Sequence, residues 1–311
     1  MVEEALIDEL TGIVGADAVR CEAPLSACTT FRIGGPAEVL VEPSSAQQVA
    51  DAVAACRAAG APVRVMGLGS DLLVADAGLV GVVVRLAERF AGVRVDGARI
   101  VADAGASNEA VARAAQAAEL AGYEFASGIP GTVGGAAIMN AGAYDGEFAD
   151  VCVRVRCLTP AGEIVDVPAA QAGWGYRKSM MSDEDYVVLE CELALTPDDA
   201  GAVQARMDDL AARRAAKQPL DMPSAGSTFK RPTGYFVGKL VQDAGLRGFR
   251  VGGAQVSEKH TGFVVNAGGA TAADVRALIA AVQERIFARE GVRLEPEVRM
   301  WGFEGDPEAR A

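Results

Sequence analysis

The chain concentrates most of its β-rich runs in the first 200 residues and spaces them irregularly. Six runs have the apolar and β-branched composition of strands: 37–42, 62–66, 80–86, 151–157, 186–195 and 294–303. A doubly wound parallel sheet would need a regular alternation of strand and helix along the chain. The irregular spacing therefore predicts an α+β fold.

Four segments repeat apolar residues with the period of a helix and have recognisable ends: 45–59, 108–121, 202–217 and 272–290. The segment 272–290 is the clearest, because Thr271 and Asp274 fit its start. Its buried face is predicted to contain Val275, Leu278, Ile279, Val282, Ile286 and Phe287. The charged stretch 202–219, closed by Pro219, is the best candidate for a domain boundary.

Composition and charge restrict where the chain acts and what it binds. The formal net charge of −13 argues against a broad nucleic-acid surface, which needs clustered Lys and Arg. No apolar run reaches the roughly 18 residues of a membrane span. The first ten residues carry four acids and no base, unlike a secretory signal. We therefore expect a cytoplasmic protein that binds neither nucleic acid nor membrane.

The cysteines and the single histidine exclude several kinds of site. The six cysteines form no C-x-x-C pair, so we expect reduced thiols and neither a disulfide framework nor a zinc cluster. A catalytic triad would have to use His260, and no multi-histidine metal site is possible. His260 itself is expected to be structural, and the chemistry to rely on other side chains or an organic cofactor.

Two glycine-rich segments point to a phosphate-bearing ligand. Residues 67–74 follow a strand-like run but lack the third glycine of a dinucleotide fingerprint. Residues 128–136 contain five glycines or prolines in nine positions, with no lysine to make a Walker loop. We expect turns that expose backbone N–H groups in the first segment, and an exposed loop against a ligand in the second. A purely structural series of turns is the alternative for the second.

Nine motifs, in order, resemble those of the UDP-N-acetylenolpyruvoylglucosamine reductase family, over about residues 25–303. They are TTFRIGGPAEVLVEP (29–43), GLGSDLLV (67–74), SGIPGTVGGAAIMNAGAYDGE (127–147), WGYRKS (174–179), KQPL (217–220), SAGSTFKRP (224–232), GKL (238–240), GGAQVSEKH (252–260) and LEPEVR (294–299). The chain is similar to the shorter class of that family, which lacks an extra Tyr-bearing loop. The resemblance implies a flavoenzyme of peptidoglycan synthesis that holds FAD noncovalently and uses NADPH to reduce the enolpyruvyl group of a UDP-sugar.

The resemblance also implies an architecture. It predicts a PCMH-type FAD-binding fold of two subdomains, 1–90 and 91–201, followed by an α+β substrate-binding domain, 202–292. The segment 293–311 is expected to return as a strand to the FAD site. The partners implied are the UDP-sugar and NADPH, and we expect a monomer.

By the same resemblance, nine residues are implied in FAD binding: Gly67, Gly69, Ser70, Asp71, Gly131, Thr132, Gly134, Gly135 and Asn140. Two positions depart from the family pattern, because Asp71 and Arg231 stand where Asn is usual. An aspartate would repel a pyrophosphate unless it were protonated or turned away. An added cation at Arg231 suits a diphosphate.

The implied reaction places hydride on one carbon of an enol ether, builds negative charge on the carboxylate at the other carbon, and protonates that carbon. The resemblance assigns Arg177 to the carboxylate, Ser227 to proton delivery and Glu297 to positioning or polarising the intermediate. Tyr144, Tyr176 and Lys239 are implied in binding the substrate.

Without the family resemblance, each catalytic candidate also has an ordinary structural interpretation. Arg177 would be a solvated surface residue, Ser227 a turn residue and Glu297 an edge-strand charge that periodicity cannot separate from Glu295.

Two rival functions stay open. One is another PCMH-type FAD oxidoreductase or oxidase acting on a sugar or alcohol. Many of these tether FAD through histidine, and no histidine precedes His260. The other is a non-catalytic FAD or nucleotide-sugar binding module. Such a module would be expected to lose Arg177, Ser227 or Glu297, and all three are present.

Overall fold

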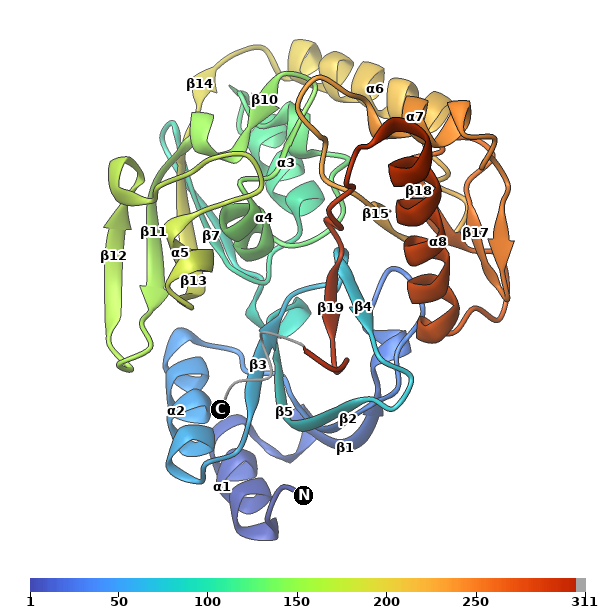
Figure 1. Ribbon diagram of the computed structural model, residues 1–311. Coiled ribbons are helices and arrows are strands. Elements are labelled where there is room, and N and C mark those ends of the chain that lie inside the picture. The colour runs from blue at the N-terminus through green and yellow to red at the C-terminus, as the bar shows by residue number, and fades with distance from the viewer. Residues whose placement is uncertain (306–311) are drawn as a thin grey trace.

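The computed structural model describes residues 1–305, which form three main sheets with flanking helices (Figure 1). Strands and helices do not alternate regularly along the chain, and two of the main sheets are wholly antiparallel. The predicted α+β class is therefore confirmed. No helix among residues 1–305 is long and apolar enough to cross a membrane.

The first sheet carries the N-terminal part of the chain. Its strand order is β1 (Val19–Pro24), β2 (Pro36–Val41), β5 (Leu79–Arg85) and β3 (Val63–Met66). β1 is antiparallel to β2, whereas β2, β5 and β3 are parallel. Helices α1 (Glu4–Val14) and α2 (Ala46–Ala58) pack against each other and bury Leu6, Leu10, Val49 and Val53 beside this sheet.

The second sheet is antiparallel throughout and lies above the first in Figure 1. Its order is β12 (Ile164–Pro168), β11 (Cys152–Leu158), β13 (Val187–Ala194), β7 (Arg99–Asp103) and β6 (Val93–Asp96). The helices of this region are α3 (Asn108–Ala117), α4 (Val133–Met139), α5 (Met180–Asp183) and α6 (Ala200–Lys217). Two short pairs join it: β8 (Leu120–Ala121) with β14 (Thr196–Pro197), and β9 (Gly142–Ala143) with β10 (Gly146–Glu147).

The third sheet has the order β15 (Ser224–Ser227), β18 (Phe263–Asn266), β17 (Ala254–Val256) and β16 (Arg250–Val251). Helices α7 (Val237–Asp243) and α8 (Ala272–Glu290) accompany it. Residues 1–305 also contain six single-turn 3₁₀ helices: η1 (Ala16–Ala18), η2 (Leu25–Ala27), η3 (Glu88–Phe90), η4 (Glu124–Ala126), η5 (Phe148–Asp150) and η6 (Ala169–Gln171).

After α8 the chain returns to the centre of the molecule. β19 (Arg299–Trp301) pairs in parallel with β4 (Leu72–Val74), and Figure 1 shows the two strands side by side between the three sheets. The predicted strand 294–303 is thus shorter than expected. Residues 294–297 lie instead beside the loop that follows β15, and an isolated bridge joins Pro296 to Phe229 of that loop. The part of the predicted segment 293–311 beyond residue 305 lies outside the described residues.

The domain boundaries stay predictions, but the packing of α6 bears on them. Its buried residues Val203 and Met207 belong to the same apolar core as the first two sheets, and the helix contacts α3 and η4. The third sheet and α8 form a separate core that also takes in Phe31, Ile33 and Leu73. This packing favours a boundary after α6 rather than before it.

The predicted helix ends agree with the caps observed for α8. Thr271 and Asp274 form a reciprocal capping box, and Gly291 ends the helix with φ +67°. Val275, Leu278, Ile279, Val282 and Ile286 are buried as predicted. Phe287 is not: 45% of it is exposed and Arg293 stacks on its ring, so the assignment of Phe287 to the buried face was wrong.

The second glycine-rich segment corrects a prediction. Residues 128–132 form a loop, but 133–139 form the helix α4 rather than an exposed loop. Gly134 faces Ala104, where an added Cβ would lie 2.8 Å from the Ala104 Cβ. The small residues therefore serve close packing of a buried helix, which outweighs the low helix propensity of glycine.

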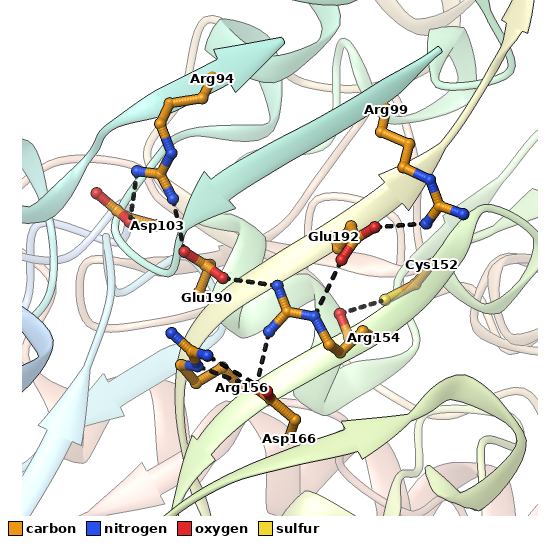
Figure 2. Close-up of polar contacts among 9 residues, drawn as sticks. All are labelled: Arg94, Arg99, Asp103, Cys152, Arg154, Arg156, Asp166, Glu190 and Glu192. Carbon is orange, nitrogen blue, oxygen red and sulfur yellow. Dashed lines mark hydrogen bonds and ion pairs between the residues drawn. The ribbon is translucent and has the colours of Figure 1, made fainter. Parts of the chain in front are cut away.

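The outer face of the second sheet carries a network of eight charged side chains (Figure 2). We call it the charge network: Arg94, Arg99, Asp103, Arg154, Arg156, Asp166, Glu190 and Glu192. Arg154 lies at its centre, with Asp166 at 2.7 Å, Glu190 at 2.9 Å and Glu192 at 3.0 Å. Four arginines and four carboxylates make the network neutral.

Candidate active site

A cavity of about 640 Å³ opens where the three sheets meet. Its walls come from the loops before β4 and α4, from the loop carrying Arg177, from the end of α6 and the segment through β15, and from Glu297 on the returning chain. This size falls in the range of ordinary small-molecule sites. Residues from distant parts of the sequence thus meet at one concave surface.

Two glycine-containing loops, 67–71 and 128–132, dock on each other along one wall. The Ser70 hydroxyl donates to the Pro130 carbonyl at 3.1 Å. Gly131 has φ +115°, and a Cβ there would lie 2.5 Å from the Ser70 Oγ. Only glycine allows this approach, which leaves backbone groups of both loops against the cavity.

The FAD-binding residues implied by the resemblance divide into two groups. Five line the cavity: Ser70, Asp71, Gly131, Thr132 and Gly135. Gly67, Gly69, Gly134 and Asn140 do not. Gly67 instead packs against Thr132, where an added Cβ would lie 2.5 Å from its Oγ1. Gly67 therefore shapes the wall from behind.

The hydrogen bonds of Asn140 serve the fold rather than the cavity. It ends α4 in the left-handed conformation, with φ +42° and 1% of its surface exposed. Its amide donates to the Gly175 carbonyl at 3.2 Å and its oxygen accepts from the Ala149 N–H at 2.9 Å. Asn140 thus holds the loop that presents Arg177, and its predicted contact with FAD has no support from the cavity lining.

Asp71 lines the cavity where β4 begins. Its carbonyl accepts from the Arg299 N–H at 3.0 Å, which joins this loop to the returning strand β19. The departure at position 71 therefore sits at a junction between two chain segments as well as at the cavity wall.

Arg177 and Glu297 meet inside the cavity. The Arg177 Nε donates to the Glu297 Oε1 at 2.7 Å, and only 22% and 11% of the two side chains are exposed. Within residues 1–305 this is the only hydrogen bond recorded for the Arg177 guanidinium, so its terminal nitrogens are available to a ligand. Arg177 has φ +54° in a tight turn closed by paired bonds between Gly175 and Lys178.

The turn that carries Arg177 is fixed to α4. The Trp174 indole donates to the Ala137 carbonyl at 2.9 Å, and the Ser179 hydroxyl to the Ile138 carbonyl at 2.7 Å. Together with the Asn140 bond, these contacts anchor both sides of the turn. The guanidinium is therefore positioned before any ligand binds.

Ser227 lies at the end of β15, after a register shift that contains Gly226 at φ +72°. Its side chain is exposed to the cavity, and no hydrogen bond of its hydroxyl to another residue within 1–305 is recorded. The next residue, Thr228, accepts the Glu297 N–H on its carbonyl at 2.9 Å. The structure thus brings Arg177, Ser227 and Glu297 to one cavity.

The side-chain partners of Glu295 and Glu297 distinguish the two glutamates that periodicity left equivalent. Glu297 points to Arg177 in the cavity, whereas Glu295 is an exposed partner of Lys230.

The implied substrate residues lie outside the lining of the cavity. Tyr176 is 57% exposed, and its hydroxyl accepts from the Arg231 N–H at 3.3 Å. Tyr144 adopts φ +53° in the turn between β9 and β10. The Lys239 ammonium pairs with Asp243 at 2.7 Å on the surface of α7. None of the three is among the residues that form the cavity walls, so their predicted contacts with the substrate stay predictions.

The single histidine and the cysteines do not form part of the cavity lining. His260 does not line the cavity, and burial lowers the pKa of its imidazole. Its Nδ1 accepts the Gly262 N–H at 3.2 Å and its ring packs edge-on against Phe263. The six cysteines are free thiols, and only Cys21 is exposed. Among residues 1–305 no group of three His, Cys, Asp or Glu could hold a metal.

The polar residues of the lining that sequence reasoning missed include Thr30, Arg32 and Arg214. The Thr30 hydroxyl donates to the Ser224 carbonyl at 2.7 Å and so ties the first region to β15. Arg214 had a usable signal. It follows the buried residues Val203 and Met207 at helical spacing, so the pattern places a cation on the core-facing side of α6.

The lining fits a flavin dinucleotide. Any side chain at Gly131 would fill the space beside Ser70 at the cavity wall, where the neighbouring backbone faces the cavity. The cavity volume also suits a large cofactor. Ser70, Gly131, Thr132 and Gly135 are the residues that would hold its pyrophosphate.

Comparisons with known proteins agree with this fit. Residues 218–301 match the model of the UDP-N-acetylenolpyruvoylglucosamine reductase C-terminal domain, and residues 37–168 match that of an FAD binding domain. The UDP-N-acetylenolpyruvoylglucosamine reductase of Clostridioides difficile is 44% identical over 293 residues, which are 94% of this chain and 96% of that protein.

Solved structures agree as well. The crystal structure of the Thermus caldophilus reductase of the same name matches with a TM-score of 0.78 and 35% identity, covering 91% of this chain and 98% of that one. An alkyldihydroxyacetonephosphate synthase matches with a TM-score of 0.51 and 15% identity over 63% of this chain and 41% of that one, which bears on the fold alone. The predicted PCMH-type fold is confirmed, and the chain belongs to the UDP-N-acetylenolpyruvoylglucosamine reductase family of FAD-dependent oxidoreductases.

Proposed function

We propose that this reductase of peptidoglycan synthesis converts UDP-N-acetyl-3-O-(1-carboxyvinyl)-glucosamine into UDP-N-acetylmuramate with NADPH. The observation that carries the proposal is the meeting of Arg177, Ser227 and Glu297 in a cavity whose other wall fits FAD. The chemistry that a bound FAD, reduced by NADPH, would supply here is a hydride from its N5 atom. The protein must then orient the enol ether, stabilise charge and deliver one proton.

Arg177 is suited to bind the carboxylate of the enolpyruvyl group. Its guanidinium is charged at all relevant pH values and can form two parallel hydrogen bonds to a carboxylate. As hydride arrives, negative charge moves onto that carboxylate, so the attraction becomes stronger in the transition state than in the ground state. Its fixed turn lets this happen with little reorganisation.

Ser227 is proposed to donate the proton to the α-carbon. A serine hydroxyl is a very weak acid, so it can act only on a strongly basic carbon and with support for the alkoxide. Its hydroxyl faces the cavity and has no recorded protein partner within residues 1–305, which leaves it able to point at a ligand. Glu297, held beside Arg177, is proposed to position the intermediate and assist proton flow.

The rival, another PCMH-type oxidoreductase acting on a sugar or alcohol, has less support. A histidine tether to FAD would have to use His260, which does not line the cavity. The cytoplasmic location and the monomeric state stay predictions, to be tested by cell fractionation and light scattering.

The half-reactions of the purified flavoprotein test the proposal. NADPH should bleach its visible flavin absorbance, and the enolpyruvyl UDP-sugar should restore it without oxygen. Ser227→Ala should leave the bleaching intact and slow restoration by about 10²–10⁴-fold, as for other positioned acids. Bleaching without restoration in the parent protein would refute the substrate, and equal loss of both half-reactions in the variant would refute the role of Ser227.

A further inference from the structure

The side chain of Ser227 depends on the backbone of β15 for its position. Its hydroxyl faces the cavity and has no recorded hydrogen bond to another residue within 1–305. The strand itself lies at the edge of the third sheet, and a register shift separates its pairings with β18 at Ser224 and Ser227. Because such a shift disrupts the hydrogen-bond ladder locally, β15 is held weakly by its own sheet.

Contacts from outside the third sheet hold both ends of β15. After the strand, the Thr228 carbonyl accepts the Glu297 N–H at 2.9 Å. At its start, the Ser224 carbonyl accepts the Thr30 hydroxyl at 2.7 Å. Gly226 lies between these two contacts with φ +72°, where the backbone has wide conformational freedom. The bond from Thr30 therefore holds the part of the strand that the contact at Thr228 does not control.

Thr30 also contacts the wall that fits the flavin. Its backbone N–H donates to the Gly69 carbonyl at 3.2 Å, within the glycine-containing loop 67–71. Ser70 of that loop lines the cavity, as does Thr30 itself. One residue is thus bonded through its N–H to the flavin wall and through its hydroxyl to the strand that carries Ser227. The spacing between these two parts of the cavity passes through Thr30.

The chain on both sides of Thr30 is anchored. Phe31 and Ile33 are buried in the core of the third sheet, with 1% and 3% of their surfaces exposed. The Asn266 amide donates to the Phe31 carbonyl at 3.3 Å, and the Thr29 hydroxyl donates to the Ile33 carbonyl at 3.0 Å. Thr30 is therefore presented to β15 from a well-packed turn.

We propose that Thr30 is a positioning residue, which holds β15 so that the Ser227 hydroxyl is correctly placed against the flavin wall. This role rests on the function proposed above, because Ser227 is the proton donor there. A displacement of about 1 Å at a reacting group can slow a reaction by about 100-fold, so a single hydrogen bond at this junction has a large effect on rate.

Thr30→Val tests the proposal, because it replaces the hydroxyl by a methyl group of similar size. In the flavin-loaded protein, reoxidation by the enolpyruvyl UDP-sugar without oxygen should slow by about 10- to 100-fold. Bleaching by NADPH should stay close to the parent rate. Thr30→Ser keeps the hydroxyl and should resemble the parent in both half-reactions. Unchanged reoxidation in Thr30→Val, or a comparable loss in Thr30→Ser, would overturn the proposal.

Thr29→Val is the matched control. The Thr29 hydroxyl makes a bond of similar kind, but to Ile33 within the same turn and not to β15. This variant should lower the thermal midpoint, because Thr29 is buried, and should leave reoxidation of the folded protein unchanged. Equal slowing in Thr29→Val and Thr30→Val would contradict the proposal, because it would show a general loosening of the turn. Loss of FAD from Thr30→Val would contradict it as well, since the residue would then be structural.

A double-variant cycle tests whether Thr30 acts through Ser227. In the Ser227→Ala background, Thr30→Val should slow reoxidation no further, and additive losses would show that Thr30 acts elsewhere.

Hydrogen exchange separates failure of this proposal from failure of the proposed function. In the flavin-loaded protein without substrate, the amides of β15 should exchange faster in Thr30→Val and not in Thr29→Val. Unchanged exchange would refute the positioning role whatever the substrate is. A parent protein that the UDP-sugar does not reoxidise would refute the proposed function, and the exchange rates would still decide whether Thr30 holds β15.

Discussion

The charge network on the second sheet and the pair in the cavity use the same two side-chain types in opposite ways. In the network, Arg154 contacts three carboxylates, and Glu190 and Glu192 each contact a second arginine. In the cavity, Arg177 contacts Glu297 through one nitrogen. The network engages all three guanidinium nitrogens of Arg154, whereas the cavity pair engages only one nitrogen of Arg177. The number of guanidinium nitrogens already bonded to carboxylates therefore distinguishes an arginine with a stabilising role from one with a binding role.

Replacing the cavity arginine should have the largest effect, and it should be on catalysis. Arg177→Met is expected to lower kcat/KM by about 10²–10³-fold, since it removes a donor aimed at developing charge. Arg177→Lys should recover only part, because an ammonium lacks the two-pronged geometry. Steady-state kinetics and thermal midpoints check this. A loss of kcat/KM that merely follows a loss of folded protein would break the comparison.

Replacing the central arginine of the network should affect stability alone. Arg154→Met leaves three carboxylates close together and is expected to lower the free energy of unfolding by about 1–2 kcal/mol, reduced by its partial exposure. Urea unfolding measures the change, and kcat/KM should stay the same. The control is Arg113→Met, which removes an exposed pair with Glu109 and should cost about 0.5 kcal/mol or less. Equal costs would mean that the network adds nothing beyond single pairs.

The smallest expected effect is the acid sensitivity of the network. Hydrogen bonds from Arg156, partly offset by burial, hold the pKa of Asp166 below its ordinary 3.8. Hydrogen bonds from Arg154, again opposed by burial, lower that of Glu192 below 4.5. A carboxyl whose pKa is depressed on folding stabilises the protein above its unfolded pKa, and this is lost as pH falls through the folded value.

Asp166→Asn should therefore flatten the decline of unfolding free energy below about pH 4, by about 0.5 kcal/mol for such an exposed group. Urea unfolding across that range measures it. An unchanged profile would place the acid sensitivity elsewhere in the chain.

Much of the fold could be read from local patterns, because the decisive contacts there are local. The capping box at Thr271 and the apolar spacing of α8 involve residues three or four positions apart. The helix predicted to reach residue 121 ends instead at Ala117, where Glu119 adopts φ +58° and the short strand β8 follows. That end depends on the pairing of β8 with β14, which no local pattern reports.

The catalytic assignments depended on family motifs, because the contacts that define the site are long-range. Arg177 and Glu297 are 120 residues apart in the chain, and nothing near either residue indicates the other. The error at α4 has a similar cause. Glycines that look like a loop by composition belong to a buried helix, in which Gly134 packs against the distant residue Ala104. Arg214 could have been found, since a cation on an apolar helical face conflicts with the local pattern.

The parallel pairing of β19 with β4 also has a consequence for synthesis on the ribosome. The loop and strand that β19 joins are made more than two hundred residues earlier, and Glu297 emerges long after Arg177. Until then, the groove beside β4 lacks Trp301, and the cavity lacks the Arg177 partner. A ribosome that stalls before residue 297 would therefore release a chain with an exposed apolar strand and an unfinished site, a target for cellular quality control rather than a slow enzyme.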